Sequence, residues 1–283
     1  MTKYYNNLPV RKRFGQNFLI NKFVIDEIIN KSNITSNDFV LEIGPGHGYL
    51  TEKIQKLVKN VFAVEIDRDL YKNLKDKFKE CSNIDFVNED FLKLELSQID
   101  FKNIPFENRK VVANIPYYIT TPIIMKLANE KIIKREGLSK SNKYFSEIII
   151  MLQKEVADRI LAKKGTKEYG SLSLICQYAF DIEKLISVDK TCFYPIPKVD
   201  STVIKMKTKL KDDFNIVNHE IMWKIINGVF TSRRKSLRNS LKIAGLSDKD
   251  IEKVSLYYDL SIRGEELEFR DFVKISNLIG DIS

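Results

Sequence analysis

The sequence predicts an α/β protein, in which a doubly wound, mainly parallel sheet is followed by a smaller all-α domain. Short apolar runs of strand length alternate with segments of helical periodicity through the first half of the chain. Glycine, acidic and amide residues follow the ends of these strands, and the carboxyl ends of strands are where an open α/β sheet binds ligands. Beyond residue 220 the periodicity is helical. We expect a sheet domain over 1–209 and a helical domain over 210–283, with charged residues 207–213 as the linker.

The composition favours a polyanionic partner and a reducing compartment. The 283 residues carry a formal net charge of +9, which suits nucleic acid, although a lysine-rich composition without such a role is the alternative. The three cysteines lack Cys-x-x-Cys spacing and two histidines are too few for a His-based metal cluster. No apolar run reaches the length of a membrane span, and the N-terminus lacks the apolar segment of a signal peptide. We expect a cytoplasmic protein without a metal.

A basic arm opens the chain over residues 3–19. Its centre is the cation triplet Arg11, Lys12 and Arg13, followed by Phe, Gly and two amides. Such a cluster is typical of a nucleic-acid or nucleotide contact, and a solvated tail is the alternative. The apolar spacing that follows predicts a helix, with Asn21 as its cap.

The first strand, 39–43, leads into a glycine-rich turn, 44–48, and a helix over 49–59. Glycines such as Gly44 and Gly46 let the backbone approach a ligand closely, and a helix N-terminus offers free N–H groups. The second strand, 61–65, ends in Glu65, about 20 positions after Gly44, which suits a pair of ribose hydroxyls.

A helix from Arg68 to about Lys79 and a third strand, 84–87, lead to Asp90. At the carboxyl end of a strand this carboxylate suits the amino group of an adenine. Asp is also a favoured helix N-cap, and that alternative stays open.

The turn from Asn114 to Tyr117 is the most informative stretch. It follows a buried strand, 111–113, which Pro116 must end because proline cannot donate to a ladder. The Asn114 side-chain oxygen and the Ile115 carbonyl would accept both N–H bonds of a nucleobase amine and favour a pyramidal, nucleophilic nitrogen. Tyr117 would stack on a base that has left its helix. An ordinary proline turn is the alternative.

The rest of the sheet domain continues the alternation. We expect a helix from Thr120 or Thr121, a strand over 147–152, a helix over 153–163, and strands over 185–188 and 201–206; the stretch 169–174 is either helical or extended. Two prolines stiffen the loop 192–200, which would hold Phe193 over a pocket unless Phe193 belongs to the core. In the helical domain, one helix face would carry cations for phosphate contacts, with a solvated face as the alternative: Arg233, Arg234, Lys235, Arg238 and Lys242.

Several segments together carry a specific resemblance: 13–19, 42–51, 114–123, 151–156, 169–173, 195–201 and 233–235. Over residues 11 to about 239 the chain resembles the ribosomal RNA adenine dimethyltransferases, most of all the branch that acts on small-subunit rRNA. The resemblance implies a Rossmann-like domain, S-adenosylmethionine as methyl donor, and dimethylation of the N6 amine of two adjacent adenosines near the 3′ end of 16S rRNA. It also implies the small ribosomal subunit as partner, a role in its biogenesis, and a monomer.

By position, the resemblance also implies site residues. Asn114 with the Ile115 carbonyl would bind the target amine, and Tyr117 and Phe193 would hold the base. No strong base is implied, because an arylamine that has accepted a methyl group is acidic. Glu65 would bind the ribose hydroxyls of the donor, and Asp90 its adenine. The residues implied to contact the donor are Asn17, Leu19, Gly44, Gly46, Glu65, Asp90 and Asn114.

One departure and three alternatives remain. Tyr118 begins a Tyr-Ile-Thr-Thr stretch where relatives commonly have Asn-Ile-Ser-Thr, so a bulkier side chain changes the pocket wall. A large-subunit methyltransferase of the antibiotic-resistance branch shares the expected fold and the Asn114 turn. A non-catalytic assembly or transcription factor would use the scaffold only to bind nucleic acid. A dehydrogenase is the third alternative, although Gly44, Gly46 and Gly48 are spaced two apart rather than as Gly-x-Gly-x-x-Gly.

Overall fold

The computed structural model describes residues 4–6, 8–11, 14–132, 144–210 and 214–280. They divide into two compact units. The sheet unit takes the described residues of 1–131, 135–157 and 181–208, and the helical unit takes those of 132–134, 158–180 and 209–283. Residues 158–180 therefore group with the C-terminal helices, whereas the expected boundary at 209/210 placed them with the sheet. That boundary stays a prediction.

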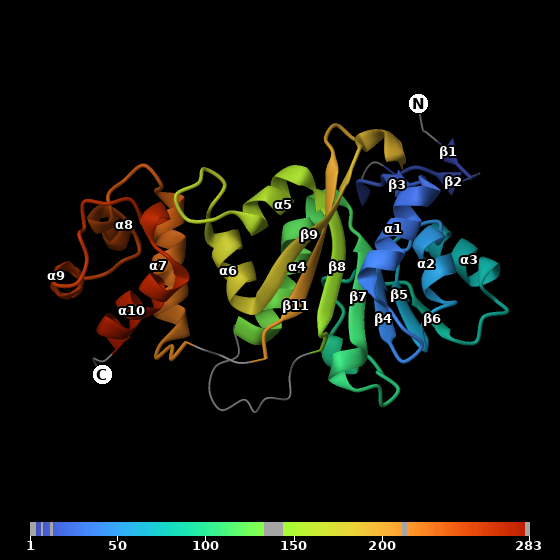
Figure 1. Cartoon of the computed structure of the whole chain (residues 1–283), viewed down its shortest axis with the longest axis horizontal. Coiled ribbons are helices and arrows are strands. Elements are labelled where there is room, and N and C mark those ends of the chain that lie inside the picture. The colour runs from blue at the N-terminus through green and yellow to red at the C-terminus, as the bar shows by residue number, and fades with distance from the viewer. Residues whose placement is uncertain (1–3, 7, 12–13, 133–143, 211–213, 281–283) are drawn as a thin grey trace. The chain divides into compact units, whose positions relative to one another are not determined.

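The main sheet of this unit has seven strands in the order β6-β5-β4-β7-β8-β11-β9 (Figure 1). The first five pair in parallel, and β11 runs antiparallel to β8. The strands expected from the sequence are all present, as β4 (Phe39–Ile43), β5 (Asn60–Val64), β6 (Ile84–Val87), β7 (Arg109–Asn114), β8 (Glu147–Gln153), β9 (Phe180–Val188) and β11 (Ser201–Thr208). The α/β fold class with a helical C-terminal part is confirmed.

Apolar runs form the central strands because both faces of the sheet are covered. Val40, Val61 and Val112 are fully buried, and Ile149 is nearly so. Helices accompany the strands: α1 (Lys22–Ser32), α2 (Tyr49–Ile54), α3 (Arg68–Lys77), α4 (Thr120–Ile132) and α5 (Lys154–Leu161). Asn21 caps α1 as predicted, its side chain accepting a hydrogen bond from the backbone N–H of Val24 at 3.2 Å.

The helix predicted over 49–59 is shorter than expected, because α2 ends at Ile54. The N–H groups of Lys59 and Asn60 donate to the Asp38 carbonyl, which turns the chain into β5. Short pieces complete the unit: β1 (Tyr4–Tyr5) pairs with β2 (Leu8–Pro9), β3 (Phe18–Leu19) pairs with β10 (Phe193–Tyr194), and 3₁₀ turns occur at η2 (Leu96–Gln98), η3 (Phe106–Asn108), η4 (Tyr117–Ile119) and η5 (Lys190–Cys192).

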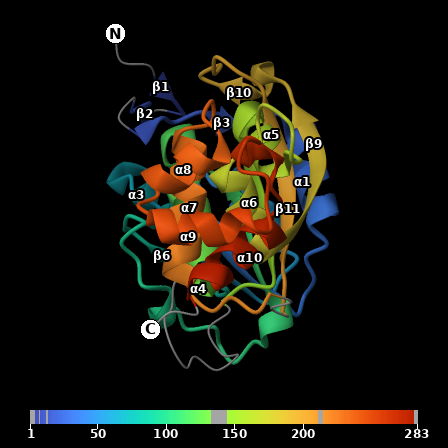
Figure 2. The ribbon, with the colours of Figure 1, turned by 90° about the vertical axis from the view of Figure 1, so that its left-hand side faces the viewer.

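The helical unit is built on α6 (Ser171–Ala179), α7 (His219–Thr231), α8 (Leu237–Ile243), α9 (Asp248–Ser255) and α10 (Phe269–Gly280), with the 3₁₀ turn η6 (Gly264–Glu266). Figure 2 shows α7 to α10 gathered in one cluster. Their apolar faces enclose a core of their own, with Met222, Ile226, Leu241 and Phe272 fully buried. The undecided stretch 169–174 thus enters a helix, α6.

The cations of this unit do not share one helix face, which corrects the prediction. α7 ends at Thr231, where the Ser232 hydroxyl donates to the Gly228 carbonyl and its N–H bonds the Val229 carbonyl. Residues 233–235 therefore lie in the turn before α8. In the described part of the chain, no helix is long and apolar enough to cross a membrane, and no group of three His, Cys, Asp or Glu side chains could hold a metal.

Candidate active site

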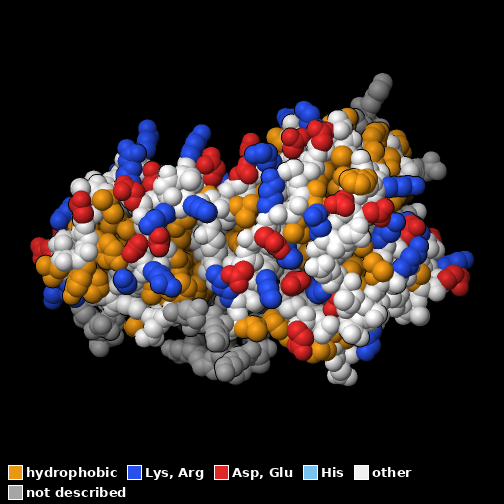
Figure 3. Space-filling view, viewed as in Figure 1, with side chains coloured by type: hydrophobic (Ala, Val, Ile, Leu, Met, Phe, Trp, Pro, Cys, Tyr) orange, Lys and Arg blue, Asp and Glu red, His pale blue; other side chains and the backbone are white. Residues whose placement is uncertain are grey.

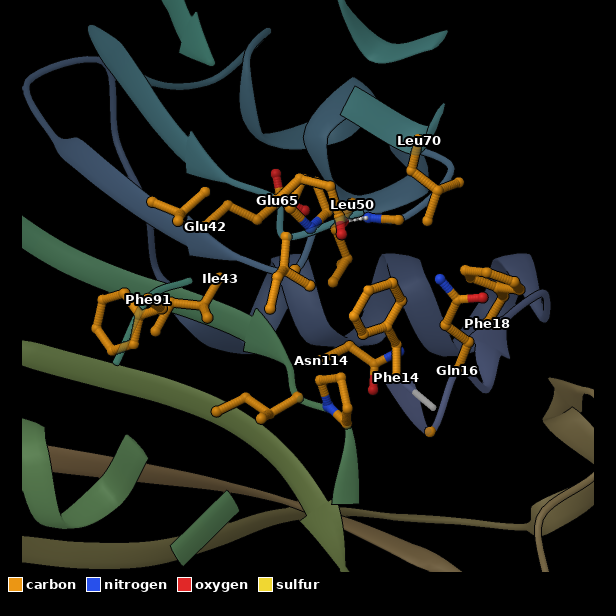
Figure 4. A pocket seen from close by; sticks show the side chains of 18 of the residues that line it. Phe14, Gln16, Phe18, Glu42, Ile43, Leu50, Glu65, Leu70, Phe91 and Asn114 are labelled. Carbon is orange, nitrogen blue, oxygen red and sulfur yellow. Dashed lines mark hydrogen bonds between the residues drawn. The ribbon is translucent and has the colours of Figure 1, made fainter. Parts of the chain in front are cut away.

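A cavity that is partly open to solvent lies where the parallel strands end, and its space, open solvent included, is about 970 Å³. Strands β4, β5, β6 and β7 end at residues 43, 64, 87 and 114, and parallel pairing brings these ends to one edge of the sheet. The arm adds Phe14 to Leu19 to the wall. Figure 4 shows Glu42, Glu65 and Asn114 around the cavity, with Phe14 and Gln16 of the arm beside it. Its place, at the carboxyl ends of parallel strands, is typical of a small-molecule site.

The glycine turn brings bare backbone to the cavity. Gly44, Gly46 and Gly48 have φ angles of +68°, +60° and +76°, a conformation that side chains disfavour. A Cβ at Gly46 would also lie 3.2 Å from the Phe18 ring. The Gly46 N–H donates to Glu65 Oε2 at 3.0 Å, so the turn is fastened to the end of β5.

Glu65 is buried in the wall of the cavity. Its other oxygen, Oε1, accepts the Asp67 N–H at 2.9 Å. Burial raises the pKa of Glu65 to about 7, against the lowering effect of the Asp67 and Gly46 N–H bonds. Each carboxylate oxygen retains a further lone pair, so the ionised group is suited to accept two hydroxyls.

Asp90 caps the turn that follows β6 and keeps one carboxylate oxygen free. Its Oδ1 accepts the Leu92 N–H at 3.0 Å, which caps the turn that follows. Its Oδ2 has no partner in the described part of the chain, and the residue lines the cavity. Capping and a free acceptor oxygen are therefore compatible.

The Asn114 turn forms another part of the wall. Asn114 is the last residue of β7, is half-buried, and makes no side-chain hydrogen bond to any residue the structure describes. The Ile115 N–H bonds the Met151 carbonyl at 3.4 Å, while no hydrogen bond in the described structure ends on the Ile115 carbonyl. The Tyr117 hydroxyl is paired with Ser201 Oγ at 2.8 Å. Two acceptors thus stand free beside a ring whose hydroxyl is fixed.

One predicted site residue lies away from the cavity wall. Phe193 is 1% exposed and belongs to the core, where β10 pairs with β3 and Phe193 lies in the same cluster as Leu19 and Ile25. Leu19 is likewise buried but reaches the wall. Asn17 lines the cavity, and its side-chain N–H donates to the Gly15 carbonyl at 3.1 Å.

The arm is held by a cation that the sequence predicted to bind RNA. Arg11 forms an ion pair with Asp67 at 3.4 Å and a closer one with Asp69. Gln16 donates to the same Asp67 at 3.0 Å, a role that the sequence did not predict. Lys12 and Arg13, also predicted to bind RNA, lie outside the described residues.

Among the helical-unit cations, Arg233 is also engaged internally, with Glu265 at 3.1 Å. Arg234, Lys235 and Arg238 are exposed and have no ion pair with any described residue. Figure 3 shows Lys and Arg mixed with Asp and Glu over the visible face rather than gathered in one patch.

Sequence reasoning missed Glu42 as part of the site. It is fully buried in β4, lines the cavity, and accepts the Thr51 hydroxyl at Oε2 at 2.6 Å, while Oε1 has no partner among the described residues. Burial raises the pKa of Glu42 to about 8. The available signal was a lone acidic residue inside an otherwise apolar strand.

His47 is a weak base that is uncharged at neutral pH. It is enclosed by the rings of Tyr5, Phe18 and Tyr49, and burial, together with Lys77, lowers the pKa of His47 to about 4. The imidazole is therefore neutral and packs as part of the wall.

Comparison with known proteins identifies relatives along nearly the whole chain. The model of the family described as ribosomal RNA adenine dimethylase matches residues 7–262. A protein of Clostridium acetobutylicum named ribosomal RNA small subunit methyltransferase A is 40% identical over 277 residues, 96% of this chain and 95% of its own. A protein of the same name from Clostridioides difficile is 40% identical over 276 residues, 96% and 92% of the two chains.

Solved structures agree in fold. A dimethyladenosine transferase from Plasmodium falciparum has a TM-score of 0.71 at 26% identity, covering 91% of this chain and 95% of its own. The 23S rRNA methyltransferase ErmE has a TM-score of 0.64 at 24% identity, covering 93% and 99%. The second likeness carries information about the fold alone.

Proposed function

The chain belongs to the ribosomal RNA adenine dimethylase family, and from this premise we propose its reaction and the residues that perform it. It transfers methyl groups from S-adenosylmethionine to the N6 amines of two adjacent adenosines near the 3′ end of 16S rRNA, during assembly of the small subunit. Relatives that are 40% identical and carry the small-subunit name support this substrate over large-subunit RNA. The observation that carries the mechanism is the pair of free acceptors at Asn114 and Ile115, on the same sheet edge as Glu65.

The cavity fits the methyl donor. S-adenosylmethionine supplies a methyl group on a positively charged sulfur, ready for a nucleophile. The ionised Glu65 would accept the two ribose hydroxyls, and the unpartnered Oδ2 of Asp90 would accept the adenine amino group. Gly44 and Gly46, where a Cβ would be strained, would let the chain lie close to the rest of the donor.

The arm would complete the donor site. Asn17 and Leu19 of the arm line the cavity, and Arg11 and Gln16 hold the arm on Asp67. Through the Asp67 N–H, this anchor is one hydrogen bond from Glu65. Donor binding and arm position would therefore be linked.

Asn114 and Ile115 would bind the target amine. With the Asn114 oxygen and the Ile115 carbonyl each accepting one N–H, the nitrogen lone pair is left to point at the methyl group. Tyr117, fixed by Ser201, would stack on the flipped base. Positioning in line supplies much of the acceleration, and the proton of the methylated amine can leave to water without a protein base. The neutral His47 agrees with such a site.

The substrate is far larger than the cavity, so further contacts are proposed outside it. The exposed Arg234, Lys235 and Arg238 would meet rRNA phosphates, and Arg233 would join them only by leaving its pair with Glu265. Lys12 and Arg13 would add contacts at the arm, and Arg11 would join them only by leaving its pairs with Asp67 and Asp69. We further propose that the protein works in the cytoplasm as a monomer.

Replacing Asn114 by Ala tests the mechanism. We expect methyl transfer to undermethylated small subunits to fall about 100-fold or more, since the Asn114 side chain acts mainly on the reacting nitrogen. Donor affinity, measured by calorimetry, should stay within several-fold of the wild type. Asn73→Ala, at an exposed position of α3, is the matched control and should behave as wild type. Wild-type rates in Asn114→Ala would contradict the mechanism.

A further inference from the structure

Tyr118 lies at the rim of the cavity. Its sequence neighbours Tyr117 and Ile119 both line the wall, and the three residues form the η4 turn that follows Asn114 and Pro116. Tyr118 is 53% exposed, whereas Tyr117 is half-buried with its hydroxyl held by Ser201. The two adjacent rings therefore have different environments: Tyr117 is part of the cavity wall, and Tyr118 faces solvent.

The exposed ring is nevertheless held in place. A Cβ built at Gly15 would lie 2.9 Å from Tyr118 Cδ1, so the ring packs directly on the backbone of the arm. Its hydroxyl makes no hydrogen bond to any residue the structure describes, so it does not tie two elements together. A ring fixed on one side and open on the other loses little conformational freedom when a flat partner joins it.

Tyr118 also lies close to the proposed donor site. Partial burial raises the pKa of Tyr118, and the carboxylates of Asp90 and Glu65 raise it further. Asp90 and Glu65 both line the cavity, as do the residues on either side of Tyr118. A nucleotide at Tyr118 would stand beside the place where methyl transfer occurs.

The substrate proposed above has two adjacent adenosines, and a flipped adenosine leaves its neighbour outside the pocket. We propose that Tyr118 is a stacking platform for this neighbouring nucleotide, a proposal that rests on the function proposed above. Stacking on an aromatic ring tolerates any base, so the platform serves whichever adenosine waits while the other is methylated. Tyr118 is then a substrate-binding residue that also keeps the RNA in register between successive transfers.

The test compares Tyr118→Ala with Tyr118→Phe, which keeps the ring, and with the control Tyr71→Ala on α3. Single-turnover methyl transfer to undermethylated small subunits is measured at saturating S-adenosylmethionine and varied subunit concentration. For Tyr118→Ala, the half-saturating subunit concentration should rise about 5- to 150-fold, the range of one base–aromatic stack. Tyr118→Phe and Tyr71→Ala should remain within twofold of wild type, and donor affinity should not change.

A second arm of the experiment removes the partner instead of the ring. Subunits reconstituted with an abasic nucleotide beside the target adenosine should bind wild type and Tyr118→Ala equally well. If Tyr118→Ala and wild type had the same half-saturating concentration of intact subunits, the Tyr118 proposal would be overturned while the proposed function would stand. Weakened donor binding with unchanged subunit binding would have the same consequence, because Tyr118 would then only support the arm. Failure of the wild-type protein to label any subunit would overturn the proposed function, and this inference with it.

Discussion

Two carboxyl groups of the cavity hold their protons to unusually high pH. Burial raises the pKa of Glu65 to about 7 and that of Glu42 to about 8. A protonated carboxyl has one oxygen committed as a donor, so Glu65 accepts a pair of hydroxyls well only after it ionises. The same burial that shapes the donor site therefore makes its occupancy depend on pH.

We predict that donor affinity rises with pH. Below about 7, Glu65 must lose a proton to bind the ribose, so the dissociation constant should fall by up to roughly tenfold per pH unit and level off above that value. Calorimetry between pH 6 and 8.5 measures it. Glu65→Gln should bind weakly with little pH dependence. Glu42→Gln removes the second titrating carboxyl, so the donor affinity of this variant should still change near pH 7. Donor affinity that is independent of pH in Glu42→Gln would refute the role of Glu65.

At the scale of elements, the arm shows that the role of a cation depends on the neighbours that the fold gives it. A triplet of cations at residues 11–13 is a reasonable indication of RNA binding. Arg11, however, is held by Asp67 and Asp69 at the start of α3, residues that became neighbours only through the fold. We therefore propose that Arg11 mainly sets the position of the arm over the donor site.

Arg11→Ala should accordingly weaken donor binding more than RNA binding. We expect donor affinity to drop several-fold, because the arm loses one of its two anchors on Asp67, with Gln16 retaining the other. The slope of log RNA affinity against log salt concentration should change by less than the loss of one phosphate contact would change it. Lys22→Ala, at an exposed cation, is the control. A reduced salt slope with intact donor affinity would show that Arg11 contacts phosphate instead.

The turn between α7 and α8 carries two exposed cations, Arg234 and Lys235, that have no ion pair with any described residue. Arg234→Glu combined with Lys235→Glu should weaken binding to small-subunit RNA and lower the salt slope by about 0.7–0.9 for each phosphate that the variant no longer neutralises. Filter binding at roughly 50 to 200 mM salt measures the slope. Lys249→Glu, at an exposed position of α9, is the control for a change of charge elsewhere in this unit, at half the change in net charge. An unchanged slope would remove this turn from the RNA footprint.

The sequence predicted elements whose identity is local. The strands of the parallel sheet are short apolar runs, and the cap at Asn21 and the residues at strand ends follow from position alone. The ends of α2 and α7 were not predictable in this way. They depend on the Asp38 carbonyl that receives Lys59 and on the Ser232 bonds to the preceding turn of helix.

For the whole molecule, parallel pairing converts separate strand ends into one site. Glu65, Asp90 and Asn114 could be assigned to one crevice from the sequence because each follows a strand of the same sheet. The burial of individual side chains could not be predicted from the sequence: Phe193 lies in the core, and Glu42 lies in the cavity wall. Both outcomes depend on packing between segments distant in sequence, as does the grouping of residues 158–180 with the C-terminal helices.

The most direct test is transfer of radiolabelled methyl groups from S-adenosylmethionine to undermethylated small subunits, large subunits and their free RNAs, followed by nucleoside digestion. We predict label on small-subunit RNA alone, recovered as N6,N6-dimethyladenosine. The same product on large-subunit RNA would contradict the assigned substrate. RNA binding without any transfer of label would contradict the assigned reaction.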